Sequence, residues 1–167
     1  IGYSLETALA DIIDNSIAAG ALNIDIMVPP DASNRRIGIL DDGIGMTHDE
    51  LMNALRWGSK SPGQLRPERD LGRFGMGLKT AAFSQCRRLT VMTRQNGVTS
   101  AARWDLDFIA QKNDWLVELI DDESDVPYGD KLGHKGTLVL LENLDRLVDQ
   151  EGGPLQDAEF RSRIDDT

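Results

Sequence analysis

Hydrophobic positions near the N-terminus recur at helical spacing. Leucine and isoleucine residues follow one another every three or four positions from Leu5 to Ile17. This spacing predicts an amphipathic helix over residues 4–19, with Ser4 as its N-cap and Gly20 as the residue that ends it.

The pattern then changes from helical to alternating. Residues 22–28 (LNIDIMV) alternate apolar and polar side chains, and residues 35–40 (RRIGIL) follow a turn that contains two prolines. The two segments are therefore predicted to pair as antiparallel strands. A second helix is predicted over residues 47–56, because Thr47 and Glu50 form a capping box before it.

The rest of the chain predicts one more helix, over residues 76–84, and several strands. Residues 57–72 have no period and are rich in glycine, proline and charge, as is typical of a lid or binding loop. The predicted strands are residues 88–94, 99–106, 115–120 and 136–143. Helices interspersed with hairpin-connected strands predict an α+β two-layer sandwich, whose mixed, mostly antiparallel sheet carries helices on one face.

Length and composition restrict the class of protein. The 167 residues suit a single domain, 1–167, with a weakly patterned tail over 144–167, and the start at Ile1 suggests a domain excised from a longer chain. The single cysteine, Cys86, excludes an internal disulfide. No apolar run approaches the length of a membrane span. We therefore expect a soluble protein of the cytoplasm without a membrane partner.

Charge is abundant but unevenly distributed. The net charge of −10 argues against direct nucleic-acid binding by this domain. Eight Lys and Arg residues nevertheless fall within residues 56–88, whereas residues 105–125 hold eight acids and one base, Lys112. A local positive field is expected around the first of these segments despite the acidic total.

Two polar residues of the first predicted helix could act together. Asp11 and Asn15 stand four positions apart, so they share one helix face. Many such faces are simply solvated. A carboxylate and a carboxamide one turn apart can also hold a water molecule and a hard cation between them.

A second candidate site is the segment LDDGIGM, residues 40–46. An Asp-Gly pair after a strand is by itself a hairpin signal. Gly43 and Gly45, followed by a capped helix, would also let the backbone approach a flat ligand, with Asp41 accepting a hydrogen bond from an amino group. A carboxylate there favours adenine over guanine. Met46 is either a soft wall for the ring or a core methionine.

The third candidate is the glycine-rich segment GRFGMGLKT, residues 72–80. Three glycines at the start of a helix favour anion binding over a flexible turn, because free backbone N–H groups and the helix dipole point at a ligand there. It is not a Walker A loop, because Leu78 separates Gly77 from Lys79 and no strand is predicted before it. The residues expected to contact phosphate are Gly72, Arg73, Phe74, Gly75, Met76, Gly77, Leu78 and Lys79.

The order of these motifs, ending in GTLVLL at residues 136–141, resembles the GHKL ATPase superfamily, which includes gyrase B subunits, the heat-shock ATPase chaperone, histidine kinases, MutL and MORC proteins. The resemblance covers Leu5 to Asn143 and implies the Bergerat ATP-binding fold. The segment GRFGMGLK is closer to the MORC and heat-shock chaperone members than to histidine kinases.

The resemblance implies roles for individual residues. Asn15 matches the magnesium-binding asparagine, and Asp11 matches the general base, which is usually Glu in the family. Asp41 matches the adenine-contacting aspartate, and Thr137 matches the threonine that supports it. The glycine-rich segment matches a lid over the phosphates. Ala18 departs from the family pattern, because several members have an acid there.

The implied activity is Mg²⁺-dependent ATP hydrolysis, with ATP and Mg²⁺ as cofactors and an ATP-dependent homodimer as a partner state to be tested. Family members complete the site with a Lys or Arg from a following domain, so the isolated domain is expected to be weakly active. The alternatives are a histidine-kinase-type domain that transfers the γ-phosphate to protein, a non-hydrolysing ATP sensor, and an interaction domain that has lost ATP binding.

Overall fold

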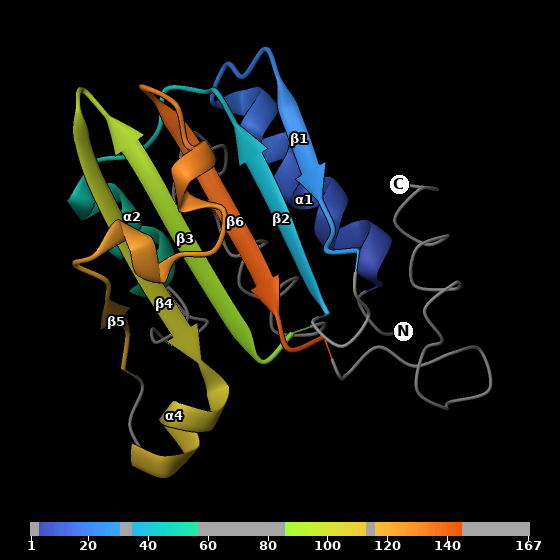
Figure 1. Cartoon of the computed structure of the whole chain (residues 1–167), viewed down its shortest axis with the longest axis vertical. Helices are drawn as coiled ribbons and strands as arrows, with labels where there is room; N and C mark the ends of the chain where they lie inside the picture. The colour runs from blue at the N-terminus through green and yellow to red at the C-terminus, as the bar shows by residue number, and fades with distance from the viewer. Residues whose placement is uncertain (1–3, 31–34, 57–85, 113–115, 145–167) are drawn as a thin grey trace, which may run out of the picture.

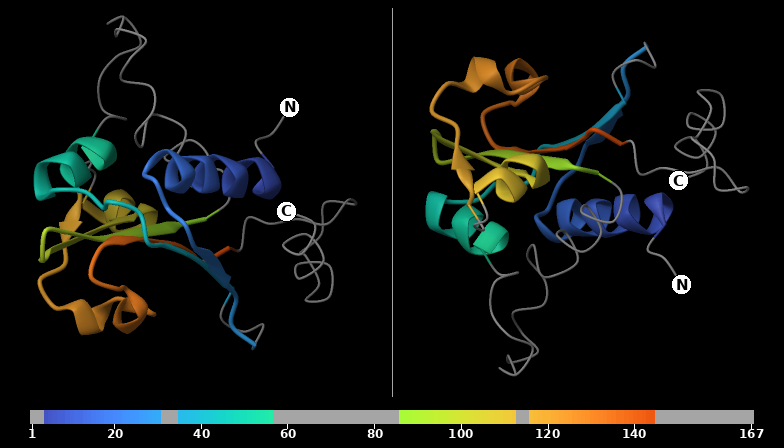
Figure 2. Two further views of the ribbon diagram at one scale, coloured as in Figure 1. Left: turned by 90° about the horizontal axis from the view of Figure 1, so that it is seen from above. Right: turned by 90° about the horizontal axis from the view of Figure 1, so that it is seen from below.

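The structure is a computed structural model, and it describes residues 4–30, 35–56, 86–112 and 116–144. Two layers make up the fold (Figures 1 and 2): a twisted six-stranded sheet, and the helices α1 and α2 on one of its faces. Short 3₁₀ turns lie over the other face. The α+β sandwich predicted from the sequence is confirmed.

Every pairing between the described strands is antiparallel, so this part of the sheet contains no parallel pair. The last of the described strands, β6, lies in the middle of the sheet, between β2 and β3. In sheet order the strands are β1 (Ile24–Met27), β2 (Arg36–Asp41), β6 (Gly136–Glu142), β3 (Arg88–Gln95), β4 (Val98–Asp105) and β5 (Glu118–Leu119).

Both helices of the first half begin at the caps that the sequence predicts. α1 (Leu5–Ala18) starts after Ser4, whose hydroxyl accepts a hydrogen bond from the Thr7 N–H at 3.2 Å. α2 (His48–Arg56) starts after Thr47, whose N–H donates to Glu50 while its hydroxyl accepts from the Glu50 N–H. The capping box is therefore formed in both directions.

The second half differs from the sequence prediction in several elements. α4 (Leu106–Lys112) follows β4 directly, and the Asp105 carboxylate caps it by accepting from the N–H groups of Asp107 and Phe108. β5 is only two residues long, shorter than the predicted strand over 115–120. Two 3₁₀ turns, η3 (Glu123–Asp125) and η4 (Gly129–Lys131), come before β6.

Hydrophobic side chains cover both faces of the sheet. The larger cluster packs α1, α2 and α4 onto the helix face and includes Leu9, Leu55, Val91, Ile109 and Val139. The smaller cluster lies on the opposite face and consists of Met92, Ala101, Val126, Leu132, Leu138 and Leu140. Because β6 lies between these clusters, every one of its residues is buried, which explains its continuous apolar run.

Three sequence predictions lie outside the described residues. They are the loop over 57–72, the helix over 76–84, and the tail over 144–167 apart from Leu144, which is buried in the larger cluster. Within the described part of the chain, no helix has the length and apolar character needed to cross a membrane.

Candidate functional site

A row of polar residues crosses the helix face of the sheet at one end. Asp41 of β2 pairs in register with Thr137 of β6, which pairs with Thr93 of β3. All three residues are buried, although most of the positions around them are apolar. Buried polar groups need hydrogen-bond partners, so this row identifies a place where polar side chains are retained for a specific arrangement.

The Asp41 carboxylate accepts three hydrogen bonds. The N–H groups of Gly43 and Thr137 donate to Oδ1 at 2.9 and 3.2 Å, and the Ser16 hydroxyl donates to Oδ2 at 2.7 Å. A carboxylate offers about four acceptor positions. Oδ2 therefore keeps one acceptor position beyond those used by the described residues. Three fixed donors also hold the carboxylate in a single orientation.

Thr93 links the rest of the row to the loop after β2. Its hydroxyl accepts from the Met46 N–H at 2.8 Å and lies 3.1 Å from both the Thr137 hydroxyl and the Gly136 carbonyl oxygen. The Met46 side chain itself is buried in the larger hydrophobic cluster. The Thr137 hydroxyl thus bonds to Thr93, while its backbone N–H contacts Asp41.

At Gly43 and Gly45, neighbouring atoms leave no room for a side chain. A Cβ on Gly45, which has a φ of +71°, would collide with the Arg94 carbonyl oxygen. A Cβ on Gly43 would lie 2.9 Å from the Ala19 Cβ. Such distances require the neighbouring backbone to move. The loop after β2 is therefore packed directly against α1 and β3.

The Asp42 side chain connects the loop after β2 to residues 22–23, which follow α1. Its carboxylate accepts hydrogen bonds from the N–H groups of Leu22 and Asn23 at 2.7 and 3.0 Å and from the Asn23 side chain at 2.7 Å. These bonds, the one from the Asn23 N–H above all, lower the pKa of Asp42 to about 2. The carboxylate is therefore ionised at neutral pH and holds residues 22–23 in place.

Replacing Asp42 with asparagine is expected to lower the melting temperature by a few degrees at pH 7, because an amide cannot accept from all three donors. The folded pKa of Asp42, about 2, lies below the ordinary 3.8. Its stabilisation is therefore present above about pH 5 and is lost as the pH falls towards 2.

Melting curves of the wild type and Asp42→Asn should consequently converge between about pH 5 and pH 2. The matched control is Asp25→Asn, an exposed position on β1 that should have little effect. A difference between wild type and Asp42→Asn that stays constant over this pH range would contradict the role assigned to the Asp42 carboxylate.

α1 brings the first candidate pair towards Asp41. Asp11 and Asn15 are both half-buried on this helix. The next residue after Asn15 is Ser16, whose hydroxyl donates to Asp41. The turn of α1 that carries Asn15 is therefore fixed to the buried carboxylate, so polar residues from α1, β2 and β6 meet at one end of the sheet.

Two contributors to this site were missed in the sequence. Ser16 stands in ADIIDNS beside residues already singled out, and its place among polar neighbours is the signal that could have identified it. Thr93 stands in RLTVMTR, where an alternating strand leaves no local sign that its hydroxyl bonds to a loop 47 positions earlier. The predicted phosphate-contacting residues, Gly72 to Lys79, lie outside the described residues.

The residues that the structure describes contain no group of three or more His, Cys, Asp or Glu side chains close enough to hold a metal ion. A magnesium ion held by one protein ligand would instead take most of its ligands from phosphate oxygens and water, as Mg²⁺ commonly does.

Comparison with known sequences decides which family shares this arrangement. A profile of the family described as histidine kinase-, DNA gyrase B-, and HSP90-like ATPase matches residues 3–134, most of the chain. The chain belongs to this family. Because this is the GHKL ATPase family, the resemblance drawn from the motifs is confirmed, and ATP binding is the expected property of a GHKL domain.

Individual relatives come from the branches that the glycine-rich segment indicates. The chain is 33% identical over 98 residues to ATPase morc-1 of Caenorhabditis elegans, covering 57% of this chain and 11% of the relative. It is 35% identical over 108 residues to chaperone protein HtpG of Gluconobacter oxydans, covering 58% and 17%. HtpG of Mycolicibacterium vanbaalenii is 30% identical over 129 residues, covering 70% and 19%. The chain thus spans less than a fifth of each relative.

Proposed function

We propose that this GHKL domain binds ATP with Mg²⁺ and hydrolyses it. The observation that supports the proposal most directly is the Asp41 carboxylate, buried, held by three donors and left with one acceptor position on Oδ2. A hydrogen-bond donor on a flat ring is the group that such a position accepts.

The chemistry of this position favours adenine. The exocyclic amino group of adenine donates, whereas guanine carries an acceptor oxygen at the corresponding position. A carboxylate repels that oxygen, and a buried acceptor left without a donor costs free energy. Because Asp41 is fixed through Ser16, Gly43 and Thr137, it cannot turn away to avoid the mismatch. Asp41 therefore selects ATP over GTP in this proposal.

In this proposal, residues of α1 near Asp41 and the glycine-rich segment bind the phosphates. Asn15 offers a carboxamide oxygen to Mg²⁺, which supplies charge neutralisation on the phosphates when bound. Asp11, one turn earlier on the half-buried side of α1, takes the proton of the attacking water. Gly72 to Lys79 close over the phosphates as a lid, with Arg73 and Lys79 adding positive charge.

In this proposal the closed lid favours association of two copies, and a Lys or Arg from a following domain completes the hydrolytic site. Such a cation matters because charge spreads over the transferred phosphoryl group in the transition state. Weak hydrolysis by the isolated chain is therefore compatible with the proposal, whereas failure to bind ATP is not.

The experiment that tests the proposal is a titration of the chain with ATP and with GTP, each with and without Mg²⁺, followed by calorimetry and by the melting temperature. ATP with Mg²⁺ should bind and raise the melting temperature, because a ligand of the native state stabilises it. GTP should bind more weakly, by at least about tenfold, the value of one hydrogen bond. No binding of ATP, or equal binding of GTP, would refute the proposal.

A further inference from the structure

The sheet face opposite α1 and α2 carries a row of charged side chains. Arg36 of β2 pairs in register with Glu142 of β6, which pairs with Arg88 of β3, which pairs with Asp105 of β4. Arg36 Nε lies 3.2 Å from Glu142 Oε1, and Arg88 Nη2 lies 2.8 Å from Asp105 Oδ2. The charges alternate across four strands, so each is balanced by a neighbour.

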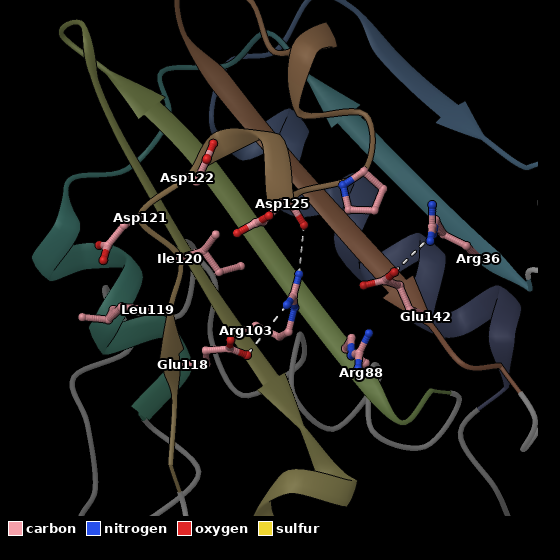
Figure 3. A pocket seen from close by; sticks show the side chains of 11 residues that line it. Arg36, Arg88, Arg103, Glu118, Leu119, Ile120, Asp121, Asp122, Asp125 and Glu142 are labelled. Atoms are coloured by element: carbon pink, nitrogen blue, oxygen red, sulfur yellow. Dashed lines mark hydrogen bonds and ion pairs between the residues drawn. The ribbon is translucent and has the colours of Figure 1, made fainter.

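A cavity of about 540 Å³ opens above this row (Figure 3), and we call it the β5 edge pocket. The other end of the same sheet face is covered by the chain itself, because residues 126–132 pack on Met92, Leu138 and Leu140. The charged end is left open. Its lining includes the guanidinium groups of Arg36, Arg88 and Arg103 together with five carboxylates, four of which belong to residues 118–125 and one to Glu142.

The arginines of the pocket are already used within the protein. Arg103 Nε donates to the Thr90 hydroxyl at 3.0 Å, and its Nη2 donates to the Asp125 carbonyl oxygen at 3.2 Å. Its side chain is only 15% exposed. Burial alone would lower the pKa of Arg88, but the hydrogen bond and charge of Asp105, together with the charges of Glu142 and Glu118, outweigh burial and raise it. The guanidinium groups thus form a fixed floor.

The carboxylates of residues 118–125 form the wall of the pocket, and they have fewer hydrogen-bond and ion-pair partners than the arginines have. The Glu118 side chain is 52% exposed, and its Oε2 lies 3.7 Å from Arg103 Nη1. Asp121 and Asp125 are exposed, and neither carboxylate has a partner among the described residues. Asp122 stays ionised because hydrogen bonds from the Ser124 side chain and N–H lower its pKa. The lining holds five carboxylates against three guanidinium groups, an excess of two negative charges.

The pocket adjoins an open edge of the sheet. β5 is last in the strand order and pairs only with β4, so its outer edge has no strand partner among the described residues. Leu119 of β5 and the nearby Leu116 are 51% and 39% exposed. Figure 3 shows the side chains of Leu119 and Glu118 on opposite sides of β5, with Glu118 pointing towards Arg103. An added strand would find backbone, apolar and acidic groups together.

We propose that the β5 edge pocket binds an extended, basic segment of a partner protein. The segment adds to the edge of β5, covers the exposed leucines, and places a Lys or Arg side chain against Glu118, Asp121 and Asp125. Backbone pairing with alternate side chains in pockets is an established mode of peptide recognition. Charge complementarity selects a basic occupant, because the fixed floor neutralises only part of the acidic wall.

This site is independent of the proposed ATP site, which lies on the other face of the sheet. The proposed ATP site uses no residue of the acidic segment 105–125. This segment supplies most of the carboxylates that line the pocket. Failure of the docking proposal would therefore leave the ATP proposal intact, and the two can be measured on the same sample.

The test uses a fluorescein-labelled peptide of alternating valine and lysine, titrated with the chain at low ionic strength and followed by fluorescence anisotropy. We expect saturable binding that weakens as salt is added. The double variant Asp121→Asn/Asp125→Asn should lower the affinity about tenfold. The control Asp25→Asn/Asp49→Asn changes the net charge equally at exposed positions on β1 and α2 and should change the affinity less than about twofold.

Each other outcome overturns the proposal. Equal losses in the two double variants would show general electrostatic attraction. Displacement of the peptide by an equal concentration of spermidine would show a cation site that needs no extended backbone. Self-association of the wild-type chain in sedimentation equilibrium, lost in Asp121→Asn/Asp125→Asn, would identify a second copy as the occupant. Binding of the peptide with glutamate in place of lysine would refute the charge argument.

Discussion

Replacing Asp41 with asparagine is expected to lower the affinity for ATP by roughly 10- to 150-fold, the value of a hydrogen bond to a charged group. The amide nitrogen introduced by the substitution would take the place of Oδ2 and face the donor of adenine, because the carbonyl oxygen is needed by the N–H groups of Gly43 and Thr137. Calorimetric titration with ATP and Mg²⁺ measures the loss.

The same variant should keep its fold. The Ser16 hydroxyl can turn to accept from the new amide, and its proton then points to the Ile12 carbonyl oxygen, which lies 3.3 Å away. Ser16→Ala offers a graded comparison: it leaves the carboxylate in place but removes one of its donors, so ATP affinity should fall about two- to tenfold. Asp41→Asn with unchanged ATP affinity, in a protein that melts like the wild type, would refute the assignment of Asp41 to adenine.

Replacing Asp11 with asparagine is expected to lower the rate of ATP hydrolysis by about 10²- to 10⁴-fold, the usual contribution of a general base, with ATP affinity changed less than about twofold. The amide cannot take a proton from water. The measurement is single-turnover release of phosphate from ATP, compared between the variant and the wild type under the same conditions.

Asp14 provides the matched control for Asp11. It lies on the same helix, is exposed, and has the same side chain, so Asp14→Asn should hydrolyse ATP at the wild-type rate. Wild-type hydrolysis by Asp11→Asn would contradict the base assignment. A wild-type protein that binds ATP but releases no phosphate would favour the non-hydrolysing sensor. Radiolabel from the γ-phosphate that stays on protein, and is not released, would favour the histidine-kinase-type alternative.

In the proposed ATP site, two contacts would connect recognition of the base with chemistry at the phosphates. Asp42 fastens the loop after β2 to residues 22–23, and Ser16 fastens α1 to Asp41. A movement of α1 would therefore disturb Asp41, Asn15 and Asp11 together. A variant that loosens either attachment should affect ATP affinity and hydrolysis in the same preparation.

Local sequence patterns determined most of the elements and the candidate motifs. The capping residues Ser4 and Thr47 located both N-terminal helices, since a cap acts on backbone groups within one turn. Alternation and turn residues predicted the β1–β2 pair for the same reason. α4 was missed because its Asp105 cap follows a strand without a break, and β5 was predicted too long because apolar side chains there remain exposed.

Only the tertiary structure decided how distant segments meet. Thr137 reaches Asp41 from 96 positions away because β6 inserts between β2 and β3, and this register also places Thr93 beside the loop after β2. The same pairing aligns Arg36, Glu142 and Arg88 on the opposite face. The periodicity of a strand predicts which face of the sheet each of its side chains takes. The register between strands depends on contacts between segments far apart in the chain. The polar row and the β5 edge pocket could therefore be found only in the folded protein.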